Sequence, residues 1–388
     1  EIWWDSSPLI YEAWRNEVLV RDPDPIASGW VEQLGRLLDP VAIAAHGQMG
    51  FRGVTTNPPL CLQAFNLDPA YWAGHIREIA AGVGSDNVEA IYWSVYLEMV
   101  RKGAEMILPV YRNSGGKYGL VSGQVDPRIV SDREAMLSQG LEIAAQGDNV
   151  MVKIPGSKEG YEVIEELTAR GIPTNNTTSF TVPQYMRCME AVSAGLERAR
   201  ANGVDLSRWR SVITHMSARL GELGDWRNEA KARGIELSLP EIRDGEEAVL
   251  KRAYWWGQQQ GHPSKMLQCS MRIERDERSG KKVSRHLADL AGGDLVYTCP
   301  PGFVAGLMQE ADELEPFDAK AIEREPDPTS LEKLLKLPSF RAAYEFDGMR
   351  PEEFCHFGAF KATETEFAAA TRQTVDFVRR CLEGLEQA

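Results

Sequence analysis

The sequence has few of the features that mark secreted, metal-binding or membrane proteins. Its 388 residues include six cysteines, scattered without a CxxC pair or any other spacing typical of metal ligands. No apolar run is long enough to span a bilayer, and the first residues do not resemble a signal peptide. We therefore expect a cytoplasmic protein with reduced thiols and no metal site.

The chain also lacks an excess of positive charge. It contains 43 lysines and arginines against 57 aspartates and glutamates, a formal net charge of −14. Such a balance argues against a nucleic-acid backbone or an anionic membrane as a partner. It does not exclude an anionic substrate, because a phosphate group responds to nearby arginines rather than to the charge of the whole chain.

What the sequence does contain is an alternation of short apolar runs with longer stretches of helical periodicity. Eight runs are predicted strands, at residues 2–5, 53–57, 119–125, 150–154, 171–177, 209–214, 266–271 and 294–298. Each is followed by helix-like sequence, and repeated strand–helix units favour a parallel sheet. Eight units predict an α/β protein with one (β/α)8 TIM barrel, in which chemistry takes place at the carboxyl ends of the strands.

Two regions depart from the bare repeat. Residues 220–261 are charged and helix-rich and are predicted to be an insertion, and residues 310–388 a C-terminal extension of a single 1–388 domain. Residues 310–328 are acidic and contain proline, which is typical of a solvated or partly ordered connector. Residues 363–385 have apolar positions at helical spacing, so we expect an amphipathic helix lying across the barrel.

Polar residues fall where the predicted strands end. A single one would mean little, because helix caps and turns need such residues anyway. Seven together are hard to explain by capping alone. They are Asp5, Asn57, Gln124, Lys153, Asn175, Thr214 and Arg272.

Lys153 carries the most chemical information. It lies among Val152, Ile154 and other apolar residues, near the end of the run at 150–154, and a Pro-Gly turn follows. Loss of hydration favours the neutral amine of a lysine. A neutral amine attacks a ketone and forms a Schiff base, which acts as an electron sink when a carbon–carbon bond breaks. The alternative is a surface lysine at a strand end, whose ammonium reaches out to solvent.

Taken in order, these strand ends resemble those of the transaldolase family, which belongs to the class I Schiff-base aldolase superfamily. The similarity runs without a break in order from Asp5 to about Leu307. The matching stretches are GVTTNPP (53–59), VSGQVDPR (121–128), VKIPGSKEG (152–160), RGIPTNNT (170–177), THMSAR (214–219) and CSMR (269–272).

The resemblance implies a transferase that moves a three-carbon dihydroxyacetone unit from a ketose phosphate to an aldose phosphate without a cofactor. It implies Lys153 as the Schiff-base lysine and Asp5 as the aspartate that assists proton transfer and binds donor hydroxyls. The remaining implied roles are sugar contacts for Asn57, Asn175 and Ser270, water binding for Thr177, and phosphate binding for Arg219 and Arg272, with Thr214 where the family has a serine. Two guanidiniums suit a phosphate, because they form forked hydrogen bonds and stay charged.

The sequence departs from the family where protons are handled. Gln124 stands where the family has its acid/base glutamate, and a carboxamide orients water but cannot take its proton. The fructose-6-phosphate aldolases of the same superfamily also have glutamine there, with a tyrosine where this chain has Met216. His215 is a tempting replacement because histidine titrates near neutrality. Alternation along the strand, however, places Thr214 and Met216 on one face and His215 on the face towards the helices.

These departures leave several functions open. The first is a transaldolase-type transferase, with an unusual acceptor in specialised metabolism as one form of it. The second is a lyase of the fructose-6-phosphate aldolase type, which releases free dihydroxyacetone. The third is a barrel that binds sugar phosphates without catalysis. In each case the expected partners are phosphorylated sugars, with no nucleic acid and no membrane, and a homodimer stays open.

Overall fold

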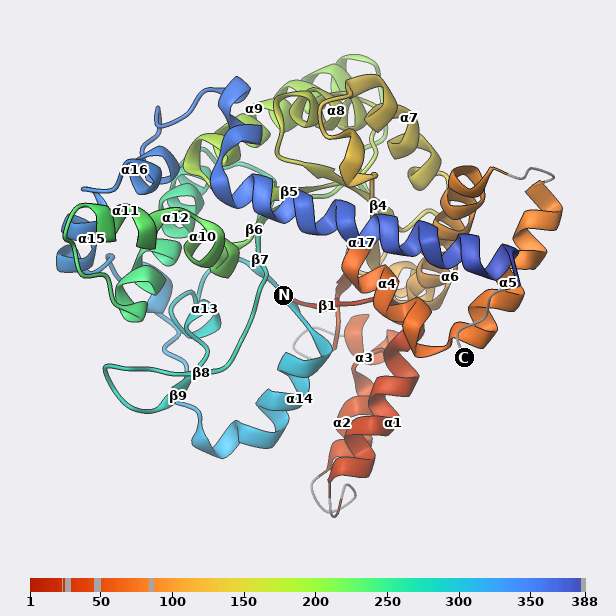
Figure 1. Cartoon of the computed structure of the whole chain (residues 1–388), viewed down its shortest axis with the longest axis horizontal. Coiled ribbons are helices and arrows are strands. Elements are labelled where there is room, and N and C mark those ends of the chain that lie inside the picture. Colours follow the sequence, from red (N-terminus) through yellow and green to blue (C-terminus); the bar gives the residue numbers. More distant parts are fainter. Residues whose placement is uncertain (23, 25–28, 45–49, 84–86, 385–388) are drawn as a thin grey trace. The chain divides into compact units, whose positions relative to one another are not determined.

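The structure, a computed structural model, describes residues 1–22, 24, 29–44, 50–83 and 87–384. In this part of the chain eight parallel strands are neighbours in the order β1-β10-β7-β6-β5-β4-β3-β2 and close into a barrel surrounded by helices (Figure 1). The predicted fold class is therefore confirmed, and each of the eight predicted strands is present. Their bounds are β1 Ile2–Asp5, β2 Gly53–Thr55, β3 Leu120–Gln124, β4 Val150–Pro155, β5 Thr174–Ser179, β6 Ser211–His215, β7 Lys265–Gln268 and β10 Val296–Cys299.

The chain divides into two compact units. Unit 1 consists of Glu1, Val130–Arg133 and Ile154–Glu364, and unit 2 of Ile2–Ile129, Glu134–Lys153 and Thr365–Ala388. Each unit is described by itself below. None of the helices in the described ranges is both long and apolar enough to cross a membrane.

Unit 2 contains the first strands and the helices that follow them. An aromatic cluster fills its core behind β1, where the Trp4 ring lies 5.3 Å from Tyr11, 4.9 Å from Trp14 and 5.2 Å from Phe51. Its helices are α1 Tyr11–Arg21, α2 Trp30–Arg36, α3 Pro40–Ala44, α4 Pro58–Leu67, α5 Pro69–Val83, α6 Val88–Asn113 and α7 Arg133–Ala144, the first residue of which belongs to unit 1.

The predicted terminal helix is present as α17, Gly358–Leu382. Within unit 2 its carboxyl-terminal part packs on α4 and α5, because the Phe377 ring lies 5.7 Å from Phe65 and Arg77 donates to the carbonyl oxygen of Cys381 at 3.3 Å. A path of this helix across the barrel stays a prediction.

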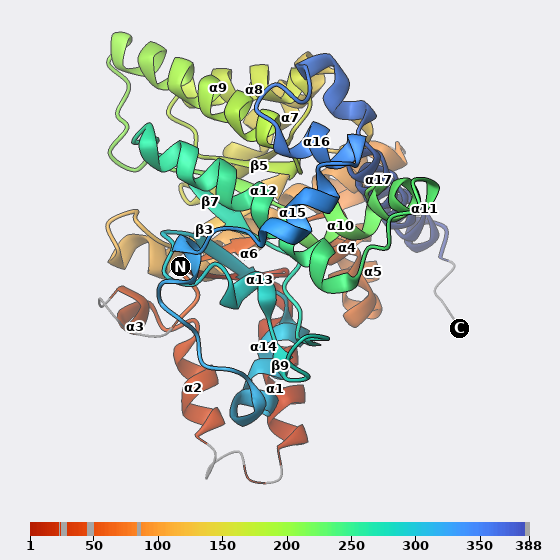
Figure 2. The ribbon, with the colours of Figure 1, turned by 90° about the vertical axis from the view of Figure 1, so that its left-hand side faces the viewer.

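Unit 1 holds the later strands and most of the remaining helices. Figure 2 shows α8 and α9 side by side, and α12 against α15 and α16. The predicted helical character of residues 220–261 is confirmed by α10, α11 and α12. The helices are α8 Lys158–Ala169, α9 Val182–Ala201, α10 Ser217–Leu223, α11 Trp226–Ala232, α12 Leu239–Gln259, α13 Arg285–Ala288, α14 Pro301–Glu310, α15 Pro328–Leu334 and α16 Pro338–Tyr344.

Two features of unit 1 differ from the expectation. A small antiparallel pair, β8 Glu274–Arg275 with β9 Lys282–Val283, follows β7; its charged sequence carries no apolar alternation that would predict a strand. The acidic connector at 310–328 is not solvated throughout, because Ala321 and Ile322 are buried. Lys251 of α12 contacts this segment, since its Nζ donates hydrogen bonds to the carbonyl oxygens of Ala321 and Arg324 at 2.9 and 3.0 Å.

Candidate active site

Lys153 lies at the fourth position of β4 and is only 5% exposed. Its strand neighbours Val152 and Ile154 are fully buried, so the residue is desolvated as its sequence context predicts. Its Nζ donates a 2.8 Å hydrogen bond to the carbonyl oxygen of Thr56, directly after β2. The alternative of a solvated lysine at a strand end is therefore wrong.

Gln124 is the register partner of Lys153 in the parallel pair β3–β4, so the two side chains leave the sheet on the same side. The preceding Gly123 faces the helices, since a Cβ there would lie 2.7 Å from Ile143 and 3.2 Å from Val100. Gln124 thus faces the barrel interior. It is 3% exposed, and its Oε1 is buried without a hydrogen-bond partner among the described residues.

The other unit 2 candidates already make polar contacts. Asp5, the last residue of β1, accepts a 2.6 Å hydrogen bond from the hydroxyl of Thr55, its register partner on β2. Asn57 caps α4, where its Oδ1 accepts from the backbone N–H of Leu60 at 3.0 Å. Capping therefore accounts for the Asn57 oxygen, whereas no sequence pattern predicts the contact of Asp5 with Thr55.

The thiol of Cys61, on α4, lies close enough to Lys153 for the lysine charge to affect its pKa. Burial raises the pKa of its thiol to about 12, although the ammonium acts in the opposite direction. A thiol with such a pKa stays protonated near neutrality and is not a nucleophile. Cys61 therefore does not compete with Lys153 as a nucleophile.

In unit 1 two candidates meet directly. Thr214, on β6, donates from Oγ1 to Oδ1 of Asn175 on β5 at 2.8 Å. Thr177, two residues further along β5, is fully buried, and its Oγ1 has no partner in the described part of the chain. A buried hydroxyl without a partner is costly, and among the candidates in the described ranges Thr177 shares this feature with Gln124.

The end of β5 is distorted next to Thr177. The β5–β6 register shifts between Asn176 and Ser179, and Thr178 has a φ of 50°, which is unfavourable for a β-branched residue. Gln184 of α9 holds this backbone by donating from Nε2 to the carbonyl oxygens of Thr178 and Gly156, at 3.1 and 2.8 Å. Local strain maintained by its surroundings is typical of functional sites.

The two arginines predicted to bind phosphate lie on segments that follow β6 and β7. Arg219 is half-buried on α10, and Arg272 comes four residues after β7. Glu222 of α10 receives both Nη groups of Arg272, with Nη2 to Oε2 at 3.3 Å. In this structure the guanidinium of Arg272, which a phosphate would need, is therefore already paired with a carboxylate. Sequence spacing could not reveal Glu222, because 50 residues separate it from Arg272.

Behind Glu222 lies a buried ion cluster. Arg243 of α12 approaches Glu222 at 3.5 Å, contacts both oxygens of Glu246 at 3.0 Å and binds Glu274 at 2.9 Å. His286 Nε2 lies 2.7 Å from Oε2 of Glu246, which is fully buried. Three carboxylates, those of Glu222, Glu246 and Glu274, thus surround the one guanidinium of Arg243. Glu222 is the most exposed of the three, and Arg243 stays paired through the other two without it.

Gly221 allows α10 to lie against this cluster. A Cβ on Gly221 would come within 2.1 Å of Glu246 Oε1 and 2.5 Å of Ile242 on α12. Any larger residue would push α10, and with it Arg219 and Glu222, away from α12. Ser270, two residues beyond β7, has a φ of 63°, a second non-glycine residue in the left-handed region beside a predicted site position.

His215 faces the helices, as strand alternation predicts. Its Nδ1 pairs with the hydroxyl of Tyr185 on α9, and its Nε2–H donates to the carbonyl oxygen of Glu246 on α12 at 3.2 Å. Burial lowers the pKa of His215 to about 3. It is therefore neutral at physiological pH and directed away from Thr214, so it does not replace the missing glutamate.

Comparisons with known proteins identify the family of the chain. The profile of the Transaldolase/Fructose-6-phosphate aldolase family matches residues 38–338. The chain belongs to this family. Similar relatives are Transaldolase 1 of Streptomyces avermitilis (35% identity, 53% of this chain, 54% of the relative), the transaldolase of Saccharopolyspora erythraea (35%, 48% and 50%) and that of Mycolicibacterium paratuberculosis (37%, 43% and 45%). The chain spans about half the length of these curated relatives.

Proposed function

We propose that this member of the family is a transferase that moves a dihydroxyacetone unit from a ketose phosphate to an aldose acceptor through a Schiff base on Lys153. The observation that carries the proposal is the burial of Lys153 on β4 beside its register partner Gln124. A desolvated amine on a barrel strand has the setting that carbonyl condensation requires.

The reaction follows from imine chemistry. Lys153 Nζ adds to the ketone carbon of the donor, and water leaves as the iminium forms. The iminium accepts the electron pair of the breaking carbon–carbon bond, so an aldose leaves and an enamine remains on the enzyme. The enamine carbon then attacks the aldehyde of the acceptor, and water releases the new ketose and restores the amine.

The remaining residues are assigned roles in this sequence of steps. We assign Asp5 to proton transfer and donor hydroxyls, and Gln124 and Thr177 to orienting water, since each presents a buried oxygen without a partner in the described ranges. We assign contacts with the sugar to Asn57, Asn175 and Ser270. Phosphate binding falls to Arg219 and Arg272, supported by Thr214.

Two further predictions belong to this proposal. The chain acts as one barrel domain over 1–388, with an insertion at about 220–261 and a C-terminal extension at about 310–388. It works in the cytoplasm on sugar phosphates, and a homodimer is compatible with this role.

An acceptor-dependence assay tests the proposal against the lyase alternative. Fructose 6-phosphate is supplied with and without erythrose 4-phosphate, and glyceraldehyde 3-phosphate is measured. We expect sustained release only when the aldose phosphate is present, because the enamine must be discharged by an acceptor. Release that is indifferent to the acceptor, with free dihydroxyacetone as co-product, identifies a lyase. No turnover with either mixture contradicts both.

A further inference from the structure

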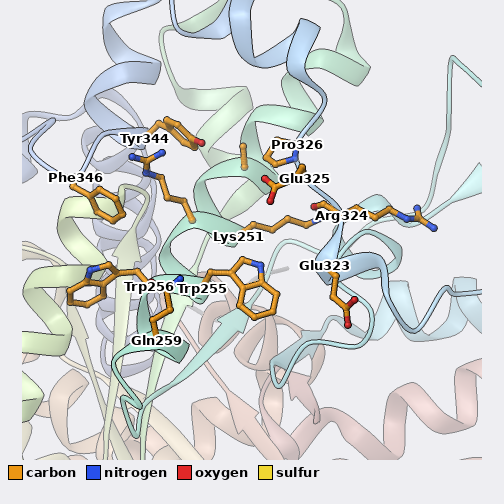
Figure 3. A pocket seen from close by; sticks show the side chains of 12 residues that line it. Lys251, Trp255, Trp256, Gln259, Glu323, Arg324, Glu325, Pro326, Tyr344 and Phe346 are labelled. Atoms are coloured by element: carbon orange, nitrogen blue, oxygen red, sulfur yellow. Dashed lines mark hydrogen bonds between the residues drawn. The ribbon is translucent and has the colours of Figure 1, made fainter.

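A cavity of about 590 Å³ lies beside α12 in unit 1. Its walls come from the carboxyl-terminal half of α12, the connector at Glu323–Pro326 and the end of α16 (Figure 3). Because β7 begins six residues after α12 ends, this half of the helix lies towards the amino ends of the strands, whereas the candidate catalytic residues lie at their carboxyl ends. The volume is in the range of sites for small organic ligands.

Arg252 is the distinctive group of this cavity. Its guanidinium lies 4.3 Å from the ring centre of Tyr344 and 4.4 Å from that of Phe346. Within the described ranges it forms no ion pair, and its buried Nε has no hydrogen-bond partner. The two rings cover the faces of the planar guanidinium, so its N–H edge is the part that can bind a planar or tetrahedral anion.

The neighbouring cations are already engaged. Lys251 gives its Nζ to the carbonyl oxygens of Ala321 and Arg324, and the Arg324 guanidinium pairs with Asp318. Among the described residues that line this cavity, Arg252 is thus the cation without an ion pair or a hydrogen bond.

The cavity is also lined by exposed aromatic rings. Trp255 is 40% exposed and Phe346 is 39% exposed, although both rings are large and apolar. Exposed rings next to a guanidinium suit a ligand that combines a planar ring with an anion. At the rim, the exposed carboxylates of Glu323 and Glu325 provide acceptors for hydroxyl or amino hydrogens.

We propose that this cavity is a second binding site, separate from the proposed catalytic function, for a planar aromatic anion of the nucleoside monophosphate class. The base stacks on Trp255, the phosphate binds the N–H edge of Arg252, and the sugar hydroxyls donate to Glu323 or Glu325. Each part of such a ligand meets one of the groups that line the cavity.

Calorimetric titration of the full chain with adenosine monophosphate tests the site. Adenosine, which lacks the anion, and inorganic phosphate, which lacks the ring, are the comparison probes. All titrations are repeated with saturating fructose 6-phosphate, so that binding at Arg219 or Arg272 is blocked. We expect the monophosphate to bind at least about tenfold more tightly than either fragment, and sugar phosphate to leave this affinity unchanged.

Three variants localise the binding. Arg252→Gln and Trp255→Ala should each weaken binding by about tenfold, because they remove the anion contact and the stacking surface. The matched control Arg324→Gln removes a cation of the same cavity that is already paired, and should change affinity less than twofold. Trp255 is exposed, so its variant keeps the test valid even where Arg252→Gln perturbs folding. The proposal is overturned by no binding at millimolar ligand, by equal affinity for adenosine, by competition from fructose 6-phosphate, or by wild-type affinity in Trp255→Ala.

Discussion

Gln124 Oε1 and Thr177 Oγ1 are buried polar atoms that have no hydrogen-bond partner among the described residues. Most buried polar groups in folded proteins are satisfied, so such atoms carry a cost in folding. Both belong to residues that the resemblance assigns to the proton-handling part of the site. The cost is therefore consistent with atoms whose partner is a water molecule or substrate of the reaction.

Thr177→Val separates the folding role from the catalytic one. Valine keeps the shape of threonine but removes a hydroxyl that nothing in the described structure satisfies, so the free energy of unfolding should stay the same or rise by up to about 1 kcal/mol. The proposed role in orienting water predicts that kcat falls by at least about tenfold. Urea unfolding and steady-state kinetics measure the two effects. A variant that loses stability and keeps kcat contradicts this role.

Gln124→Glu probes the missing carboxylate. A glutamate beside Lys153 supplies a proton acceptor that the carboxamide is not, and kcat for three-carbon transfer should rise by about tenfold. Transfer assays across pH 5–9 measure the change. If activity appears only in this variant, the native protein is a sugar-phosphate binder and not an enzyme.

Glu222 is predicted to compete with phosphate for Arg272. Glu222→Gln removes the negative charge but keeps the size, so KM for fructose 6-phosphate should fall by about threefold, a magnitude typical of a partly exposed ion pair. Glu274→Gln is the matched control, because it removes a carboxylate of the same cluster that contacts Arg243 and not Arg272. Equal KM values in wild type and Glu222→Gln would show that the pair does not limit phosphate binding.

At the scale of elements, His215 joins β6 to α9 and α12 through its two ring nitrogens. Its pKa is about 3 in the folded protein, lowered by burial from an ordinary value of 6.5. The unfolded chain therefore binds the proton more strongly. The stability that neutral His215 contributes is fully present above pH 6.5 and is lost as the pH falls towards 3.

His215→Gln should flatten the acid side of the stability profile. In the wild type this histidine contributes a slope of up to about 1.4 kcal/mol per pH unit between pH 6.5 and 3, and the variant should lack it. Unfolding free energies from urea titrations at several pH values measure the slope. The variant should also be less stable at pH 7, because it loses packing and hydrogen bonds. Parallel profiles for the two proteins would refute the assignment.

The contact of α17 with α4 is predicted to contribute substantially to unit 2. Phe377→Ala removes a ring that is 6% exposed and lies against Phe65, which should lower the free energy of unfolding by about 3 kcal/mol. Phe317→Ala, at a position that is 52% exposed, should change it by less than about 0.5 kcal/mol. Equal effects of the two substitutions on chemical denaturation would show that α17 is not held by this contact.

The elements were largely predictable because barrel strands are short apolar runs that end in polar residues. Val150 to Ile154 followed by Pro-Gly is such a case, and β4 forms there. The β8–β9 pair was not predictable, since Glu274 and Lys282 carry no apolar alternation. The bulge at Thr178 was not predictable either, because its backbone is held by Gln184, a residue of the next helix.

For the whole molecule, the order of apolar and polar residues along the chain predicts the strands and their polar ends. It does not predict the contacts between side chains. The burial of Lys153 and the direction of His215 follow from position and alternation along single strands. The pairing of Arg272 with Glu222 follows from tertiary packing, which in turn needs Gly221 against Glu246. Electrostatic partners of this kind depend on three-dimensional distance, and no sequence pattern encodes them.

Condensation of Lys153 with the donor ketone is the step on which the proposed reaction depends. Incubation with fructose 6-phosphate followed by borohydride reduction, then peptide mass spectrometry, tests it most directly. We predict a stable three-carbon adduct on the peptide that contains Lys153, and no adduct at that peptide in Lys153→Met, which should also lose transfer activity. An adduct at a different lysine, or full turnover in Lys153→Met, would show that Lys153 is not the Schiff-base residue.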